Sequence, residues 1–318
     1  MNNKPTLIAV VCGLITALLF LAPLKLAGLG FIMSIFTAMP LFVAALGFGT
    51  LYGIVAGVVA AVVVGVFTGP LGALAVGGAT MLPAIWVGHM VGLSRNDNGM
   101  AEWFPVSDIL FRMALMCAAI AFGVGALVGY TPELAAQQAQ VIMEQIVAAQ
   151  SEASGTPALS AEAIQLQSSR IAKLIPLAMP VSLLLLMVIN LILAARFARK
   201  RGWVLRPQVH LPTETALPII AVGILAVGIA LSFVSGPIAL IAQVITGALG
   251  GAFLLVGLAT LHTMTLRTPA RGFVLGLTYF ALLISRYLAG IIALIGIAET
   301  LFQIRARRGT PNPPSQQN

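Results

Sequence analysis

The stretch MPLFVAALGFGTLYGIVAGVVAAVV, residues 39–63, contains no charged side chain. A helix that crosses the hydrocarbon core of a bilayer needs about 20 predominantly apolar residues, so this stretch is long enough to enter a membrane. The segment GFGTLYG, residues 47–53, interrupts it with glycines, which are typical of a tight turn. The stretch therefore predicts the end of one membrane span and the start of the next, joined by almost no loop.

The composition of the whole chain extends this prediction. Hydrophobic residues make up 59% of the sequence and charged residues only 8%, whereas a soluble domain carries roughly 25% charged residues. The apolar segments are long blocks and do not alternate as the strands of a membrane β-barrel do. We therefore expect an all-α, polytopic bundle of about eight to ten transmembrane helices. The candidate spans are residues 6–24, 30–48, 50–68, 70–91, 106–130, 174–195, 216–234 and 237–261.

The distribution of charge predicts how the spans are oriented, because Lys and Arg collect in short cytoplasmic loops. The densest basic segment is ARFARKRGWVLRP, residues 195–207, which we expect in the cytoplasm together with the N-terminus. Residues 131–172 carry mostly acidic charge and lie between the fifth and sixth spans, so we expect them on the outer side. Their helical periodicity predicts two short amphipathic helices at the outer surface; the alternative is a solvated connector.

These patterns predict the organisation of the chain. Residues 1–195 form a six-span bundle in which 131–172 is the insertion outside the cytoplasm. Residues 196–215 are a basic cytoplasmic linker, residues 216–304 contain the C-terminal transmembrane segments, and 305–318 is a disordered tail rich in basic residues and proline.

The last apolar block, residues 273–303, contains Arg286 near its midpoint. A guanidinium that faces lipid at the bilayer centre costs at least about 2.5–3.5 kcal/mol, and two arrangements avoid this cost. The block is a hairpin of two short helices with Arg286 at the turn, or it is one tilted helix with Arg286 in the bundle interior. We favour the hairpin, because it returns the basic C-terminal tail to the cytoplasm.

No catalytic constellation is visible in the sequence. His89, His210 and His262 occur without the spacing of a metal site, so we predict neither a metal nor a cofactor. The sequence has no nucleotide-binding loop and no nucleophile elbow. We expect neither an enzyme nor a nucleic-acid-binding protein, and the lipid bilayer is the first predicted partner.

The polar residues within the spans are the candidate site residues. Asp108 and Arg112 are four residues apart, which favours an ion pair on one helix. Asn190 and Gln243 are amides in the middle of spans, where they form hydrogen bonds between helices or contact a ligand. Arg286 joins this set if it faces the bundle.

Two prolines are candidate helix breaks. Pro40 and Pro83 each interrupt a predicted span. A proline frees a backbone carbonyl, and such breaks either line a substrate site or form simple kinks.

Several of these segments resemble one family. Residues 39–63 resemble the second and third spans of the YybS-like bacterial membrane proteins, and GLATLHTMTLRTPARGFVLGLTYFALL, residues 257–283, resembles their Gly-Leu-Ala-x-x-His segment. In the closing IGIAETLFQIRARR, Gly296, Glu299 and Arg305 take the positions of the family's Gly-x-x-acidic…Arg pattern. RGWVLRPQVHLPTE, residues 201–214, is similar to the family's basic central linker.

The resemblance implies a multi-pass protein of the bacterial inner membrane whose function is unknown. It also implies that the first half is related in fold to the substrate-binding components of energy-coupling-factor transporters. Those components bind a small molecule and dock onto a coupling subunit through small residues of their first helix. Ala9, Gly13 and Ala17 have the corresponding small-xxx-small spacing here.

Two functions remain open from the sequence. The first is a protein that binds or transports a small molecule through a cavity in the first six spans, with a coupling partner in the membrane. The second is a membrane scaffold or regulatory protein that engages a cytoplasmic partner through its basic linker and tail. A polar cavity among the first six spans favours the first function.

Overall fold

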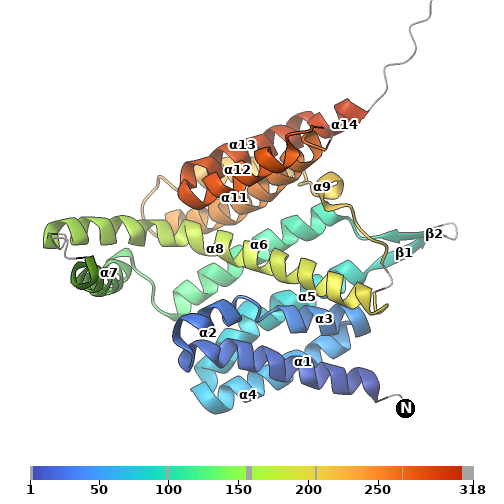
Figure 1. Ribbon diagram of the computed structural model, residues 1–318, viewed down its shortest axis with the longest axis horizontal. Coiled ribbons are helices and arrows are strands. Elements are labelled where there is room, and N and C mark those ends of the chain that lie inside the picture. Colours follow the sequence, from blue (N-terminus) through green and yellow to red (C-terminus); the bar gives the residue numbers. More distant parts are fainter. Residues whose placement is uncertain (1–2, 98–99, 155–159, 205, 267, 310–318) are drawn as a thin grey trace, which may run out of the picture.

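The computed structural model describes residues 3–97, 100–154, 160–204, 206–266 and 268–309 (Figure 1). Within these residues the regular secondary structure is helical apart from one antiparallel hairpin, which confirms the predicted all-α bundle. The first elements are α1 (Lys4–Leu21), η1 (Ala22–Leu24), α2 (Ala27–Ser34), α3 (Met39–Phe48), α4 (Thr50–Val76), the π-helical η2 (Gly77–Met81) and α5 (Leu82–Gly92). They are followed by β1 (Ser94–Asp97), β2 (Met100–Trp103), α6 (Val106–Leu127), α7 (Pro132–Ser154) and α8 (Ala161–Lys200). The last elements are α9 (Leu211–Glu214), α10 (Ile220–Leu231), α11 (Pro237–Met264), α12 (Arg271–Ile284), α13 (Arg286–Phe302) and α14 (Ile304–Gly309).

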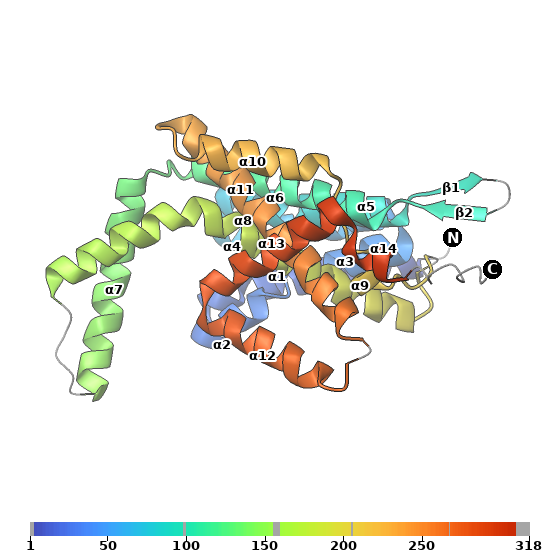
Figure 2. The ribbon, with the colours of Figure 1, turned by 90° about the horizontal axis from the view of Figure 1, so that it is seen from above.

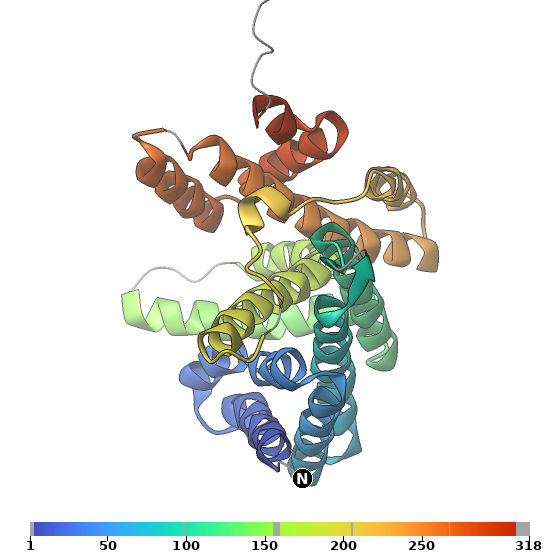
Figure 3. The ribbon, with the colours of Figure 1, turned by 90° about the vertical axis from the view of Figure 1, so that its right-hand side faces the viewer.

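The helices form three layers (Figures 1 and 3). Helices α1 to α5 make one outer layer, α6 and α8 cross the middle, and α10 to α14 make the other outer layer. The middle of the bundle is filled by large apolar side chains such as Phe42, Met113, Leu184 and Phe253, which are all fully buried.

Six helical stretches of the described chain are long and apolar enough to cross a membrane. One of them, Thr50–Gly92, contains a break at Gly69, whose φ of 79° lies in the left-handed region. Gly49, between α3 and α4, has a φ of 97°. Only glycine adopts such angles without a steric penalty on its Cβ. The predicted turn at residues 47–53 is therefore confirmed, and Gly69 breaks the helix between the two candidate spans 50–68 and 70–91.

The two candidate proline breaks lie at the starts of helices. Pro40 is in the first turn of α3, after the interruption that separates α3 from α2. Pro83 is in the first turn of α5, directly after the π-helical segment. Proline is tolerated there because the first turn of a helix has no acceptor for its N–H.

Helix α8 differs from the prediction for residues 131–172. The second of the two predicted short helices is not separate, because it continues into the sixth span as one helix of 40 residues. At about 1.5 Å per residue this helix is about 60 Å long, roughly twice the thickness of the hydrocarbon core. It is therefore longer than one membrane crossing needs. Helix α7 packs beside its N-terminal part, where the Ser168 hydroxyl contacts the Met143 sulfur at 3.6 Å.

The two ends of the bundle differ (Figures 1 and 2). Helix α7 and the start of α8 lie at one end, whereas the N-terminus, the β-hairpin, α9 and α14 lie at the other, which we call the linker end. This arrangement agrees with the predicted separation of the acidic segment from the basic linker. The assignment of the linker end to the cytoplasm stays a prediction.

The last apolar block is broken at Ser285, which is extended with φ −126° and ψ 111° between α12 and α13. This break confirms the hairpin and excludes one continuous helix over 273–303. Helix α13 returns to the linker end (Figure 2), where the Arg305 guanidinium donates hydrogen bonds to the carbonyls of Pro212 and Thr215. The side chain of Arg286 lies outside the described part of the chain.

Helix α10 is shorter than the predicted span 216–234. It has 12 residues, because Pro218 and the residues around it precede its first turn. Helices α10, α12 and α13 are each too short to count among the six spanning stretches.

Candidate functional site

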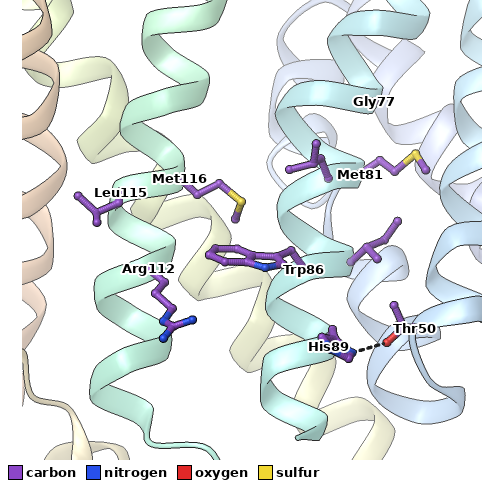
Figure 4. A pocket seen from close by; sticks show the side chains of 10 residues that line it. Thr50, Gly77, Met81, Trp86, His89, Arg112, Leu115 and Met116 are labelled. Atoms are coloured by element: carbon purple, nitrogen blue, oxygen red, sulfur yellow. Dashed lines mark hydrogen bonds between the residues drawn. The ribbon is translucent and has the colours of Figure 1, made fainter.

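An open groove of about 820 Å³ lies between α5 and α6, and we call it the α5–α6 groove (Figure 4). Pockets of about 300–1,000 Å³ are typical of small-molecule sites. The groove is lined by Thr50, Gly77, Met81, Leu82, Ile85, Trp86, His89, Arg112, Leu115 and Met116.

Helical spacing brings these residues together. Leu82, Ile85, Trp86 and His89 are three or four residues apart and therefore share one face of α5. Arg112, Leu115 and Met116 share one face of α6 in the same way. Gly77 contributes free space, because a Cβ added there would have no heavy atom within 4 Å.

The walls of the groove are apolar except at one end. There the Thr50 hydroxyl and the His89 Nδ1 form a hydrogen bond of 2.9 Å, and Arg112 lies across the groove on α6 (Figure 4). Gly77, Met81 and Met116 lie farther along the groove. The polar end is close to the linker end of the bundle, because Thr50 begins α4 and His89 lies in the last turn of α5.

The predicted ion pair between Asp108 and Arg112 is wrong. Neither residue forms an ion pair with any described residue, and the Arg112 guanidinium lies over the Phe104 ring at 5.2 Å. Asp108 is in the first turn of α6, where the helix dipole already stabilises a carboxylate. The Arg112 side chain is exposed at the groove, and its positive charge has no counter-ion among the described residues.

Asn190 links α8 to the segment between α2 and α3 through one hydrogen bond, and it does not line the groove. Its side chain is buried, and its Nδ2 donates to the carbonyls of Ile35 and Leu186, both at 2.8 Å. The Ile35 carbonyl lies in the interruption between α2 and α3, where a regular helical partner is missing. The Oδ1 of Asn190 has no hydrogen-bond partner among the described atoms.

The other predicted site residues lie elsewhere. Gln243 is half-buried on α11, and it does not line the groove. Ala9, Gly13 and Ala17 are buried on α1, and a Cβ on Gly13 would overlap the Ala56 carbonyl of α4. This stripe packs α1 against α4 of the same chain. It is buried inside the bundle and is therefore not accessible to a docking partner.

The structure therefore brings only Arg112 of the predicted polar set to the groove, and it adds Thr50, Trp86 and His89. In the sequence, His89 lacks the spacing of a metal site and has no other visible partner. The spacing of Ile85, Trp86 and His89 directly after Pro83 is the signal that could have identified this face. Among the described residues no cluster of His, Cys, Asp and Glu could hold a metal ion.

One family model matches most of the chain, from α1 to α13. The family described as "Predicted membrane protein (DUF2232)" matches residues 14–300. The chain belongs to this family. The match includes residues 131–172 and ends before Arg305. No curated protein and no solved structure matches the chain.

Proposed function

We propose that this membrane protein binds an amphiphile with an acidic head group in the α5–α6 groove. The observation that carries the proposal is the Arg112 guanidinium, which has no counter-ion among the described residues and lies at the polar end of an otherwise apolar groove. A guanidinium binds phosphate and carboxylate groups through charge-assisted, bidentate hydrogen bonds.

We assign each part of the ligand to a part of the groove. The acidic head lies between Arg112 and the Thr50–His89 pair, and the apolar chain lies along Trp86 and Met116 (Figure 4). Methionine and tryptophan provide adaptable, polarizable walls for such a chain. Because the polar end faces the linker end, the ligand enters from the leaflet on that side.

We propose that the protein binds this ligand and does not transform it chemically. We place the protein in the bacterial inner membrane with a cytoplasmic N-terminus, and we infer that a separate coupling partner supplies energy if the ligand is moved. The YybS-like assignment and the relation to substrate-binding components of energy-coupling-factor transporters rest on the sequence resemblance. The buried stripe on α1 means that a coupling partner would use another surface.

A scaffold role is the second candidate. The observation that favours it is the exposure of Arg196, Lys200 and Arg201 at the end of α8, which gives the linker end a basic surface. Such a surface attracts an acidic protein or anionic lipid. A scaffold would keep its function when the α5–α6 groove is filled.

The test uses native mass spectrometry of the full-length protein in detergent. The probe is 1-oleoyl lysophosphatidic acid, and 1-oleoylglycerol is the control because it lacks only the phosphate. We expect the lysophosphatidic acid complex to be retained at least tenfold more than the neutral one. Arg112→Gln should remove this preference, since it removes the charge that selects the phosphate.

Filling the groove separates this function from a scaffold. Gly77→Leu adds a side chain where a Cβ meets no atom within 4 Å, so it should fold and block the lipid. Gly78→Leu is the matched control, because Gly78 also has open space but does not line the groove. Equal lipid retention by the two variants would remove the proposal.

A further inference from the structure

A second cavity of about 410 Å³ lies at the linker end, between the α3–α4 turn, the end of α5, the β-hairpin and the segment that follows α8. We call it the linker pocket. Its walls include Trp103, Trp203, Arg206, Phe48 and Gly92. The α5–α6 groove is separate, although Thr50 and His89 line both cavities.

Aromatic contacts hold the segment after α8 against the bundle. The Trp203 ring lies 4.9 Å from the Phe48 ring and 6.1 Å from the Phe197 ring, measured between centroids. Trp203 also lies directly over Gly47, where a Cβ would be 3.3 Å from the Trp203 Cβ. These contacts fix one aromatic wall of the linker pocket.

Arg206 is the charged group of the linker pocket. Its side chain is only 9% exposed. It donates hydrogen bonds to the carbonyls of Val91 at 3.2 Å and Phe104 at 3.0 Å, and it lies 5.9 Å from the Trp103 ring. A guanidinium has five N–H donors, so these two bonds leave three N–H groups of a residue that lines the pocket without a partner among the described residues.

The charge of Arg206 has no counter-ion in the described part of the chain. Glu214 is the acidic residue that affects the pKa of Arg206, but Glu214 is exposed and its carboxylate accepts a hydrogen bond from the His210 backbone N–H. Burial lowers the pKa of the Arg206 guanidinium; Glu214 raises the pKa and Arg199 lowers it. A buried charge of this kind is costly unless an opposite charge accompanies it.

We propose that the linker pocket binds a soluble organic anion with a planar apolar body. The carboxylate or phosphate group of the ligand pairs with Arg206, and its flat body packs against Trp103 and Trp203. The segment after α8 lies outside the six spanning stretches, so the ligand comes from water and not from the bilayer. This site takes a different class of ligand from the α5–α6 groove and does not depend on the amphiphile.

The test is equilibrium dialysis of the full-length protein in detergent, corrected with protein-free micelles. The anionic probes are 2-naphthoate and 2-naphthyl phosphate, and the better of the two identifies the head group. The neutral control is 2-naphthamide. We expect saturable binding of at least one anion, at least tenfold tighter than that of the amide. Equal binding of all three compounds, or no saturable binding, overturns the proposal.

Two variants locate the site. Arg206→Gln should weaken anion binding at least tenfold, whereas Arg201→Gln, which removes an exposed charge of the same segment, should leave it within twofold. Because Arg206 also holds two backbone carbonyls, Gly92→Leu provides an independent test. Gly92 lines the pocket, and a Cβ there meets no atom within 4 Å. Anion binding that survives Gly92→Leu unchanged overturns the assignment to this pocket.

Discussion

Glu299 and Arg305 form a buried ion pair that ties the end of α13 to the linker. The Arg305 Nε donates to a Glu299 carboxylate oxygen at 2.9 Å, and the two side chains are only 10% (Arg305) and 7% (Glu299) exposed. The Arg305 backbone N–H also donates to this carboxylate, at 3.1 Å. The remaining nitrogens of the Arg305 guanidinium donate to the carbonyls of Pro212 and Thr215, so all three of its nitrogens have a partner.

Removing one partner of this pair should be strongly destabilising. Glu299→Ala leaves a buried guanidinium without its carboxylate, and breaking a buried pair costs about 3–5 kcal/mol. We expect a large fall in the thermal unfolding temperature in detergent. The matched control is Glu102→Ala, which breaks the exposed pair with Arg95 and should cost about 0–1 kcal/mol. Similar losses in the two variants would show that the buried pair has no special role.

The hairpin of α12 and α13 predicts the side of the C-terminus. Because Arg305 binds the linker, a C-terminal fusion should lie on the same side of the membrane as Gly202. A green fluorescent protein fused to the C-terminus should be fluorescent, and a phosphatase fused there should be inactive. The Gly202→Cys variant should resist an impermeant thiol reagent added to intact cells. If the fusion and the thiol introduced by Gly202→Cys report opposite sides of the membrane, the hairpin is contradicted.

The crossing of α11 and α13 predicts a sharp difference between two glycines of α11. A Cβ on Gly257 would overlap the Ile292 carbonyl, whereas a Cβ on Gly250 would have no atom within 4 Å. Overpacking a close contact costs about 1–3 kcal/mol, so Gly257→Ala should lower the unfolding temperature. Gly250→Ala should leave it unchanged or raise it, because alanine favours helix by up to about 1 kcal/mol. An equal effect of the two substitutions would argue against the crossing.

The sequence predicted the parts of the fold that depend on local physics. Long apolar runs define spans, and the turns at Gly49 and Gly69 require a backbone angle that glycine favours. The helix boundary expected near residue 173 is wrong, because the change from polar to apolar residues there lies within α8, which continues through it. No proline or glycine lies between Ser160 and Leu174 to interrupt α8.

The candidate site is formed by contacts between helices. The spacing of residues along one helix cannot predict such contacts. The four-residue spacing of Asp108 and Arg112 allows an ion pair, but Phe104, which precedes the helix, competes for the guanidinium. Thr50 and His89 are 39 residues apart, so their hydrogen bond exists only once α4 and α5 are packed. The linker pocket likewise joins Arg206 to carbonyls that lie 115 and 102 residues earlier in the chain.

The break between α2 and α3 supports a last prediction, which concerns Asn190. The side chain amide of Asn190 satisfies the Ile35 carbonyl at the break, and a buried polar group that loses its partner costs about 1–3 kcal/mol. Asn190→Leu keeps the size of the side chain and removes both donors, so we expect a lower unfolding temperature in detergent. Gln243→Leu is the matched control, since the described residues form no hydrogen bond with this second mid-span amide. It should change stability by less than about 0.5 kcal/mol, the usual limit away from such features. If the two leucine variants unfold at the same temperature, the hydrogen bond from α8 does not hold the break.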